Sequence, residues 1–474
     1  MHPPRLPYDP RTHKGLSFHD AVPSFLGLRD TPSAYLERCL ATIEAREPEV
    51  QAWQAMGIGA AREAAHAATA RYRIGRPLSS IDGMPVGIKD LIQTRDLPTG
   101  EGIQGNYAAR GDADSACVQA LRAAGAVIVG KLVTTELGGG APSRTRNPFD
   151  ALRSPGGSSS GCGAAIGAAM LPVAIGTQVG GSIIRPAGYC GNFAFKPSFG
   201  SLHRGERQSS SQSCIGVHAG SLPDLWRVAH EIASRTGGDP GHTGLAGPAE
   251  LAAAAPPGTL AVMECSGWRG TTGATREAFQ DILAQAQHAG VKLLRRGDHA
   301  DLDAFEESLE RTADFVGVIL DFENRWYVEN LARRLDSLHP STLRSLERAR
   351  QLSVADYRHA LALRGQSQAL FQRLSLSVDA LVSPSAPAPA PLLDAAPPID
   401  GEPIYVATGN PVFNLPGSML LAPVITLPLM AVEGLPLGVQ LIGHCHADHR
   451  LHGIARWAME SLRPVSAQES TTST

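Results

Sequence analysis

Two spacings of apolar residues recur along the chain, and each predicts one kind of secondary structure. Four apolar residues after Thr31 recur every three or four positions, as on one face of a helix: Leu36, Cys39, Leu40 and Ile43. Thr31 is a suitable N-cap for this helix, and Pro32 suits its first position. Similar reasoning predicts helices at 60–73, 115–124, 161–170, 275–289 and 447–460, and several amphipathic helices across 301–375.

Short apolar runs bounded by turn residues predict strands at 83–89, 126–129, 259–263, 291–294, 424–429 and 438–441. A helix, Gly125 and a strand follow one another directly at 115–129, an order that implies a parallel or mixed sheet. Residues 382–398 are dense in proline and alanine, which predicts an extended loop or a linker. From Val465 onwards the chain is polar, and we expect it to fray.

Size and charge narrow the classes of protein that fit. The chain has 474 residues, with 42 basic and 45 acidic side chains and only 5% aromatic residues. This balance argues against nucleic acid as a partner. No apolar run is long enough to cross a membrane, and the N-terminus lacks the apolar core of a signal peptide. Seven scattered cysteines without a CxxC pair favour a reduced, cytoplasmic setting.

Ser158 and Ser182 provide the strongest chemical signal, because each follows a pair of glycines and they lie 24 residues apart. A serine hydroxyl becomes a nucleophile only when a neighbour removes its proton. The glycines of the run Val179-Gly180-Gly181-Ser182 allow consecutive backbone N–H groups to converge, as an oxyanion hole requires. Ser158, in the run GGSSSG, could relay a proton. Taken alone, the run at Ser182 is better explained as a Gly-rich loop that turns the chain, and the run at Ser158 as a flexible Gly/Ser loop.

A lysine in an apolar strand supplies a candidate base. Lys89 ends the run 83–89, and burial there would disfavour its charged form and leave a neutral amine. The alternative is an ordinary ion pair between Lys89 and Asp90 at the end of the strand. For the run GGSSSG at Ser158, a phosphate-binding loop fits poorly, because the Gly-Lys-Ser/Thr ending of that motif is absent. Lys89, Ser158 and Ser182 together predict a serine hydrolase with a lysine base.

These motifs, in this order and spacing, resemble the amidase signature family. The resemblance rests on GGSSSG followed by GTQVGGSIIRPAGYCG and KPS, and on the lysine strand 82–90. It extends to GAVIVGKLVTTE at 125–136, to 145–148 and to the strands within 414–441. About two-thirds of the chain is covered, and the match is weakest across 236–400.

The resemblance implies an α/β fold, an α/β/α sandwich around a large mixed β-sheet. Its expected parts are an N-terminal helical segment packed on the core (1–80), the signature core (81–235), a variable helical region with substrate-pocket elements (236–400), and C-terminal strands and a helix that complete the same domain (401–474). It implies no metal and no organic cofactor. The expected partner is a small-molecule amide or carbamate substrate, and the family's habit suggests a homodimer.

The resemblance also assigns roles to individual residues of an amidase. The catalytic residues it implies are Lys89 as base, Ser158 as proton relay and Ser182 as the nucleophile that carries the acyl group. Ser158 would follow a cis peptide bond from Gly157. The oxyanion hole falls on Val179, Gly180, Gly181 and Ser182. The supporting positions are Gly157, Ser159, Thr177, Gln178 and Arg185.

Two positions depart from the family's usual pattern. Gln178 stands where many members have aspartate, and Arg185 follows Ser182 by three residues rather than two, with Ile184 at the nearer position. A branch of the family has the same glutamine, so the departures do not imply loss of activity. They argue against a subunit of a tRNA amidotransferase, which usually carries the aspartate.

Other functions remain open at this stage. The same three residues would serve a carbamate (urethane) or aryl-ester hydrolase. The further alternatives are a catalytically inactive binding protein and an ammonia-supplying amidotransferase subunit. The sequence does not identify the substrate.

Three further groups of residues have simpler structural interpretations. His444, Cys445 and His446 are spaced like metal ligands, but they fall where the last strand is expected to end, so a solvated strand end is preferred. Cys190 has no adjacent base and is expected to be a buried structural cysteine. Four aromatic residues on one helical stretch are expected in the core, and the alternative is that they line an apolar acyl or aryl pocket: Phe315, Phe322, Trp326 and Tyr327.

Overall fold

The computed structural model describes residues 6–105, 113–205, 210–393 and 407–468. The strands are β1 Trp53–Met56, β2 Pro85–Lys89, β3 Val127–Leu132, β4 Val173–Gln178, β5 Phe193–Lys196, β6 Cys214–Ala219, β7 Thr259–Val262, β8 Lys292–Leu294, β9 Ala380–Pro384, β10 Val424–Val432, β11 Leu435–Ile442 and β12 Val465–Ala467. The α-helices are α1 Val22–Leu26, α2 Pro32–Val50, α3 Ile58–Arg73, α4 Ala116–Ala123, α5 Ser160–Gly167, α6 Ile184–Tyr189, α7 Leu222–Thr236, α8 Gly273–His288, α9 Ala300–Leu309, α10 Thr312–Ala332, α11 Pro340–Gln351, α12 Val354–Leu374, α13 Leu415–Met419 and α14 Asp448–Ser461. Two short 3₁₀ helices are η1 Glu136–Gly138 and η2 Ser266–Gly270.

The strands form one mixed sheet of 12 strands in the order β1-β3-β2-β4-β6-β5-β10-β11-β9-β7-β8, with β12 paired to β10. Strand β2 runs parallel to both of its neighbours, β3 and β4. From β4 through β6, β5, β10 and β11 to β9, each neighbour is antiparallel. Strands β7 and β8 return to the parallel arrangement. The predicted mixed sheet is therefore confirmed.

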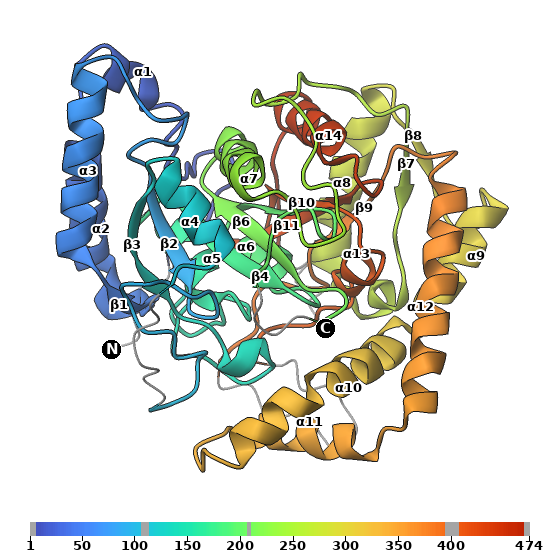
Figure 1. Cartoon of the computed structure of the whole chain (residues 1–474). Helices are drawn as coiled ribbons and strands as arrows, with labels where there is room; N and C mark the ends of the chain where they lie inside the picture. The colour runs from blue at the N-terminus through green and yellow to red at the C-terminus, as the bar shows by residue number, and fades with distance from the viewer. Residues whose placement is uncertain (1–5, 106–112, 206–209, 394–406, 469–474) are drawn as a thin grey trace.

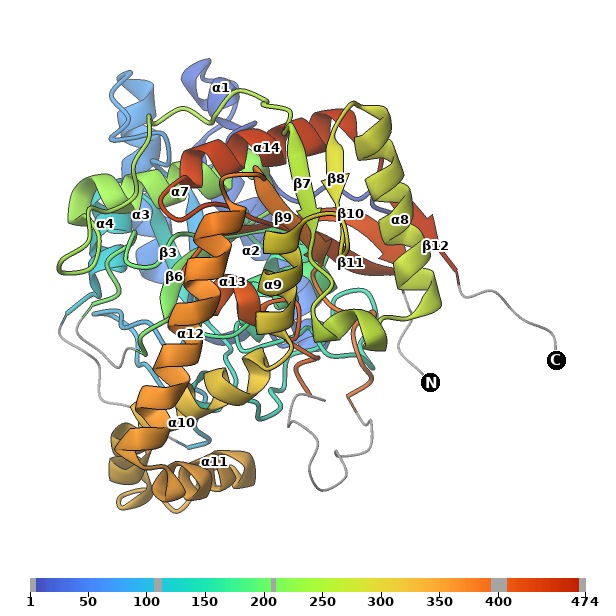
Figure 2. The ribbon, with the colours of Figure 1, turned by 90° about the vertical axis from the view of Figure 1, so that its right-hand side faces the viewer.

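Helices cover both faces of the sheet, which makes the fold the predicted α/β/α sandwich. Successive side chains of a strand point to opposite faces. On β5, the ring of Phe195 lies 4.4 Å from that of His452 on α14, whereas Ala194 packs in a second core cluster with Ile183, which precedes α6. Helix α14 and helix α6 therefore cover opposite faces. Helix α14 packs against β10 and β11, and it lies near the top of the molecule in Figure 2.

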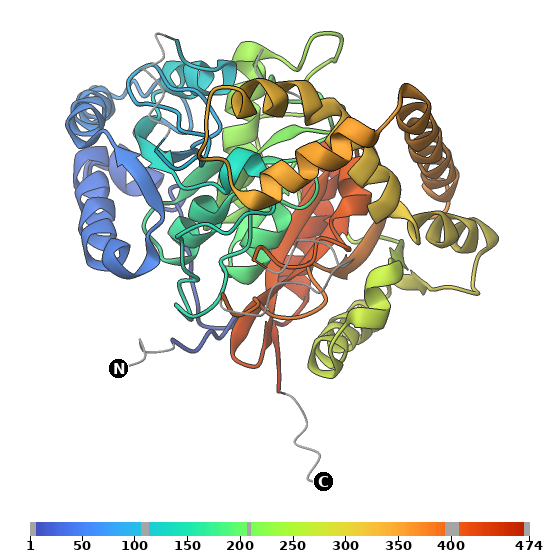
Figure 3. The same cartoon turned by 90° about the horizontal axis from the view of Figure 1, so that it is seen from below.

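The two flanks of the sheet carry different helical layers. Helices α2 and α3 lie beside β1 and β3, and helices α10, α11 and α12 project on the other side of the molecule (Figure 1). Seen from below, the blue α2 and α3 lie on one side of the molecule and the yellow-green α8 lies on the other (Figure 3). Helix α2 begins as predicted, because Pro32 is its first residue and Thr31 Oγ1 accepts a hydrogen bond of 3.1 Å from Ala34 N.

Most of the predicted helices and strands are present within a few residues of their expected bounds. Two predictions were wrong. Residues 382–384 are not loop, because they belong to β9, which pairs with β11 on one side and with β7 on the other; residues 394–398 of that expected loop lie outside the described residues. Val465–Ala467 is not frayed, because it forms β12 and pairs with Met430–Val432 of β10. The polar residues 469–474 lie outside the described residues.

Small residues allow α5 to approach its neighbours closely. A Cβ atom at Gly167 would lie 2.3 Å from the carbonyl oxygen of Cys190, and one at Gly161 would lie 2.4 Å from that of Ala52. Helix α5 begins at Ser160, directly after Ser158 and Ser159, so this packing fixes the position of both serines. Among the helices of the described residues, none is long and apolar enough to span a bilayer.

Candidate active site

Parallel pairing of β2 with β4 brings Lys89 to the first serine. The register pairs Ile88 with Ile175, so the C-terminal ends of both strands lie side by side. Lys89 is the last residue of β2, and its Nζ lies 2.8 Å from Ser158 Oγ. The same nitrogen donates to Thr177 Oγ1 at 2.8 Å and lies 3.3 Å from the Thr177 carbonyl oxygen. Three oxygen atoms therefore surround the Lys89 nitrogen.

The ion pair between Lys89 and Asp90 is not formed. Asp90 instead pairs with Lys131, whose Nζ lies 3.0 Å from Asp90 Oδ1, and both side chains are buried. The other carboxylate oxygen of Asp90 accepts a hydrogen bond of 3.0 Å from Gly100 N. Because Asp90 pairs with Lys131, Lys89 has no carboxylate partner in the described part of the chain.

Burial lowers the pKa of Lys89 from its usual 10.5 to about 7. The side chain is fully buried, and desolvation penalises the ammonium form more than the amine. A smaller electrostatic effect of Cys162 raises the pKa of Lys89. A substantial fraction of Lys89 is therefore a neutral amine near pH 7, as a general base requires.

The loop that carries Ser158 is fixed on both sides. The Gly157–Ser158 peptide bond is cis. The carbonyl oxygen of Ser158 accepts hydrogen bonds from Thr134 Oγ1 at 3.1 Å and from Thr135 N at 3.2 Å. The carbonyl oxygen of Gly157 accepts one of 2.8 Å from Arg185 Nη2. Ser158 is 3% exposed, so its hydroxyl faces Lys89 in a nearly dry environment.

The loop that carries Ser182 is connected directly to the Ser158 loop. Ser159 N donates to the Ser182 carbonyl oxygen at 3.3 Å, and Ser159 Oγ donates to the Thr177 carbonyl oxygen at 3.2 Å. Ser182 is 9% exposed and is thus the more accessible of the two serines. Among the described residues, no hydrogen bond joins the hydroxyls of Ser158 and Ser182. Catalytic hydrogen bonds are often long before substrate binds.

The backbone around Ser182 offers free donors. Side chains hold two carbonyl oxygens of this loop, since Gln212 Nε2 donates to Val179 O at 2.9 Å and Ser418 Oγ donates to Gly180 O at 2.8 Å. The amide groups of Gly180, Gly181 and Ser182 make no hydrogen bond within the described residues. Consecutive amides without partners beside a serine hydroxyl are the arrangement that stabilises an oxyanion.

Comparison with known proteins agrees with this geometry. The family model described as Amidase matches residues 34–452. The chain belongs to the amidase signature family. Its members hydrolyse amides, and its fold is confirmed by a solved structure described as "Crystal structure of amidase", with a TM-score of 0.82, 25% identity, and coverage of 94% of this chain and 100% of that one.

Two curated members of the amidase signature family show how widely its functions range. The A subunit of the glutamyl-tRNA(Gln) amidotransferase of Chloroflexus aggregans is 31% identical over 439 residues, which are 86% of this chain and 88% of that protein. The fatty acid amide hydrolase of Arabidopsis thaliana is 29% identical over 416 residues, which are 85% of this chain and 68% of that protein. These likenesses establish the family and leave the substrate open.

Gln178 and Arg185, the residues that depart from the usual family pattern, both make buried contacts. Gln178 Oε1 accepts from Ile183 N at 2.7 Å and from Ile184 N at 3.1 Å, which anchors the start of α6 behind Ser182. Arg185 is 3% exposed and donates from Nε to the Thr408 carbonyl oxygen at 2.6 Å. Gln178 therefore supports the loop of Ser182, and Arg185, which also donates to the Gly157 carbonyl oxygen, supports the loop of Ser158.

Replacement of Gln178 by alanine is expected to destabilise the amidase fold. The change leaves the buried N–H groups of Ile183 and Ile184 without an acceptor, and an unsatisfied buried donor costs about 1–3 kcal/mol. Thermal and urea unfolding measure this loss. The partly exposed Gln285 is a matched control, because it also bonds two backbone atoms, both of Arg463, yet water can replace it there; Gln285→Ala should cost less than half as much. Equal losses in both variants would contradict the anchoring role.

Several contacts of the site could not have been found from the sequence. Gln178 Nε2 donates to Ser418 Oγ at 3.0 Å across a separation of 240 residues. Asn414 accepts from Arg185 Nη1 at 3.3 Å. A Cβ atom at Gly181 would lie 2.6 Å from Asn414 Oδ1, which explains why a glycine precedes Ser182. The only sequence signal for these positions was the resemblance of 414–441 to the end of the family's domain.

The other candidate residues do not assemble into sites. His444 Nε2 bonds the Val378 carbonyl oxygen at 2.8 Å, and Cys445 Sγ donates to the Leu420 carbonyl oxygen at 3.4 Å. Within the described ranges, no three potential metal ligands gather around one point. Strand β11 ends at Ile442, just before His444, as expected. Cys190 is fully buried, and burial raises the pKa of its thiol well above the ordinary range, which fits a structural residue.

The four aromatic residues of helix α10 divide between the two interpretations. Phe315 is buried in the apolar core, as expected. The hydroxyl of Tyr327 donates to Glu101 Oε2 and fastens α10 to the loop after β2. Phe322 and Trp326 instead line a cavity. The expectation of core packing is therefore wrong for Phe322 and Trp326.

Proposed function

We propose that the chain is an amidase that cleaves the C–N bond of a carboxylic amide through an acyl-enzyme on Ser182. The observation that carries this proposal is the 2.8 Å contact between the buried Lys89 Nζ and Ser158 Oγ. A neutral amine has two N–H groups and one lone pair. Donation to the hydroxyl and carbonyl oxygens of Thr177 uses both N–H groups and leaves the lone pair for the Ser158 proton.

The proposed reaction has two acyl-transfer steps. Lys89 accepts the proton of Ser158 while Ser158 accepts that of Ser182, and Ser182 Oγ attacks the amide carbonyl carbon. The amides of Gly180, Gly181 and Ser182, with Val179 at the start of the loop, would hold the oxyanion, a contribution of about 3–4 kcal/mol. The proton returns along the same relay to the departing amine. Water then attacks the ester, and the products are the acid and the amine.

The supporting residues keep the relay in place in this proposal. Thr177 orients the Lys89 amine, and Ser159 connects the two serine loops through its amide and hydroxyl. Arg185 and Gly157 hold the backbone before Ser158. Because the proton moves only between side chains of this chain, the proposed chemistry needs neither a metal nor an organic cofactor.

Hydrolysis of an amide by the purified chain alone, in the presence of hydroxylamine, tests whether an acyl-enzyme forms. Hydroxylamine competes with water for an ester on Ser182, so part of the product should be the hydroxamate. The ratio of hydroxamate to acid should be the same for butyramide and for N-methylbutyramide, because both give one acyl-enzyme. Different ratios, or cleavage without any hydroxamate, would contradict the two-step reaction.

The same relay would also cleave a carbamate or an aryl ester. Rates on an anilide, a phenyl carbamate and a phenyl ester with matched groups distinguish these bonds. If the carbamate has the highest kcat/KM, the chain is better described as a urethanase. All three substrates would be attacked by Ser182. This result would therefore change the bond that the chain is proposed to cleave, and the proposed mechanism would stay the same.

A second candidate function follows from the similarity to the glutamyl-tRNA(Gln) amidotransferases. The matching protein from Chloroflexus aggregans is 31% identical over 86% of this chain. A chain with that role would release ammonia from glutamine or asparagine for a partner, and its glutaminase activity in isolation would be low. Gln178 in place of the usual aspartate argues against it. Turnover of simple amides by the isolated chain, with no stimulation by a partner protein, would exclude this function.

A further inference from the structure

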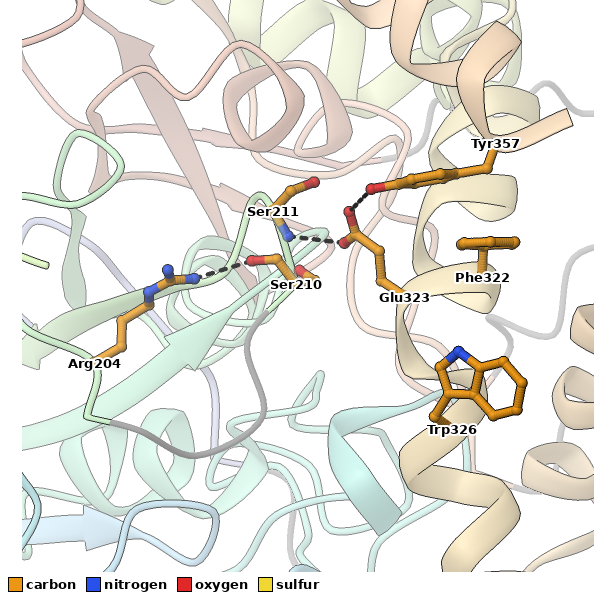
Figure 4. Close-up of a pocket in the computed structure, with 7 residues that line it drawn as sticks. All are labelled: Arg204, Ser210, Ser211, Phe322, Glu323, Trp326 and Tyr357. Carbon is orange, nitrogen blue, oxygen red and sulfur yellow. Dashed lines mark hydrogen bonds between the residues drawn. The ribbon is translucent and has the colours of Figure 1, made fainter. Parts of the chain in front are cut away.

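A cavity of about 340 Å³, widely open to solvent, lies between helices α10 and α12 and the segment that leads into β6. Figure 4 shows Phe322, Trp326 and Tyr357 on the helical side and Ser210 and Ser211 facing them. The volume is at the lower end of the range of small-molecule sites. Its helical side lies within 236–400, where the chain resembles its family least, and its other side belongs to the signature core.

The helical wall of the cavity is aromatic. The rings of Phe322 and Tyr357 stack at 4.4 Å with an angle of 9° between their planes. Trp326 lies one turn further along α10 and is 62% exposed, although tryptophan side chains are usually largely buried. Arg325 Cζ stands 4.4 Å from the centre of the Trp326 ring and supports it from one side. The arrangement offers flat apolar faces to a planar group.

The charged side chains that line the cavity already have hydrogen-bond or ion-pair partners. Glu323 Oε2 accepts from Ser211 N at 2.8 Å, and its Oε1 accepts from the Tyr357 hydroxyl at 2.8 Å. Arg364 lies close enough to act on the Glu323 charge and donates to Ser211 Oγ at 2.7 Å. On the other side, Arg204 forms an ion pair with Asp239. This pairing favours an uncharged ligand.

One polar group is left over for such a ligand. Ser210 is 4% exposed, and its Oγ has no hydrogen-bond partner among the described residues. A buried hydroxyl without a partner costs free energy, which a ligand that reaches it would recover. Ser210 lines the cavity together with the aromatic side chains.

The cavity is connected to the catalytic loop through one residue. Gln212 directly follows Ser211, is fully buried and donates from Nε2 to the Val179 carbonyl oxygen at 2.9 Å. Through this hydrogen bond, the segment that forms one wall of the cavity contacts the oxyanion loop. Ser211, which lines the cavity, is therefore adjacent in sequence to a residue that contacts the loop of Ser182.

We infer that this cavity binds an uncharged aromatic ring of the substrate, so that the chain acts on amides that carry an aryl group. The inference rests on the proposed function for the chemistry at Ser182. The binding that it describes can be measured without catalysis.

Calorimetry on the Ser182→Ala variant tests this binding with two matched probes. Acetanilide carries the ring, and N-methylacetamide has the same amide without it. We expect acetanilide to bind at least tenfold more tightly. The change Trp326→Ala, made in the same background, should weaken acetanilide about tenfold, as expected for loss of an aromatic pair. Binding of N-methylacetamide should not change.

Leu343→Ala is the matched control, because Leu343 is a large exposed apolar residue of the neighbouring helix α11 and does not line the cavity. It should leave both affinities unchanged. Circular dichroism checks that each variant is folded, and Trp326→Leu, which keeps apolar volume, should lose most of the same affinity. Equal affinities for the two probes, or no effect of Trp326→Ala, would overturn the inference. Failure of the proposed catalysis would appear separately, as hydrolysis that persists in the Ser182→Ala variant.

Discussion

Alanine at position 182 should reduce kcat for amide hydrolysis by about 10⁵-fold or more, to the background of the assay. Ser182 Oγ is the atom that forms the acyl-enzyme in the proposed reaction, and water cannot take its place in the relay. When a nucleophile and its base act together, removing the nucleophile alone lowers the rate about as much as removing all of the cooperating residues. Steady-state rates with a chromogenic anilide measure the loss.

The fold of the Ser182→Ala variant should be unchanged, because Ser182 makes its described hydrogen bond through the carbonyl oxygen, to Ser159 N. Thermal unfolding checks this. Ser234→Ala, on the exposed side of α7, is the control and should keep full activity. A folded Ser182→Ala variant that retained more than about a hundredth of the wild-type rate would show that another group is the nucleophile.

Replacement of Lys89 by alanine should lower kcat/KM by about 10³-fold, the range expected for loss of a general base. The wild-type pH profile should also change. Burial lowers the pKa of Lys89 to about 7, so the amine is charged and inactive below that pH and neutral above it. The rate of the wild type should therefore rise as pH increases through about 7, and the rate of Lys89→Ala should lose this rise.

Lys292→Ala serves as the control for the loss of an amine, because Lys292 lies exposed on the edge strand β8. Its activity and pH profile should equal those of the wild type. Lys89→Arg is a sharper test, since a guanidinium remains charged at every pH of interest and cannot accept the Ser158 proton. An active Lys89→Arg variant would contradict the role of a neutral amine.

The sequence was sufficient for those parts of the fold whose signals are local. Three such signals are the Thr31 cap, the small residues of α5 and the apolar run of β2. Each signal spans only a few residues, and the helix or strand that it predicts is present. Strands β1, β4, β5 and β6 were not predicted, and β9 and β12 were predicted as loop and as frayed chain. The partners of β9 and β12 lie far away in the sequence. The sequence 380–384 contains a proline and is typical of a loop, yet β7 and β11 hold it from both sides. Tertiary pairing overrides the local preference.

In the candidate site, too, residues with a local sequence signal could be predicted and residues from distant segments could not. Lys89, Ser158 and Ser182 were found from glycines and an apolar strand that surround each of them in sequence. The ordinary ion pair of Lys89 with Asp90 could be excluded only by the structure, which shows that Asp90 pairs with Lys131. Gln212, Asn414 and Ser418 come from distant segments and carry no local motif. The cavity beside Trp326 is likewise formed by segments more than a hundred residues apart.

The central claim is that neutral Lys89 activates Ser182 through the hydroxyl of Ser158. The rate at which phenylmethylsulfonyl fluoride modifies Ser182, measured by mass spectrometry as a function of pH, tests it most directly, because it isolates the attack by Ser182. We predict a rate that rises with an apparent pKa near 7 in the wild type. In Lys89→Ala and in Ser158→Ala it should be at least about a hundredfold slower and flat across this range. Modification that keeps its rate and its rise near pH 7 in either variant would contradict the claim.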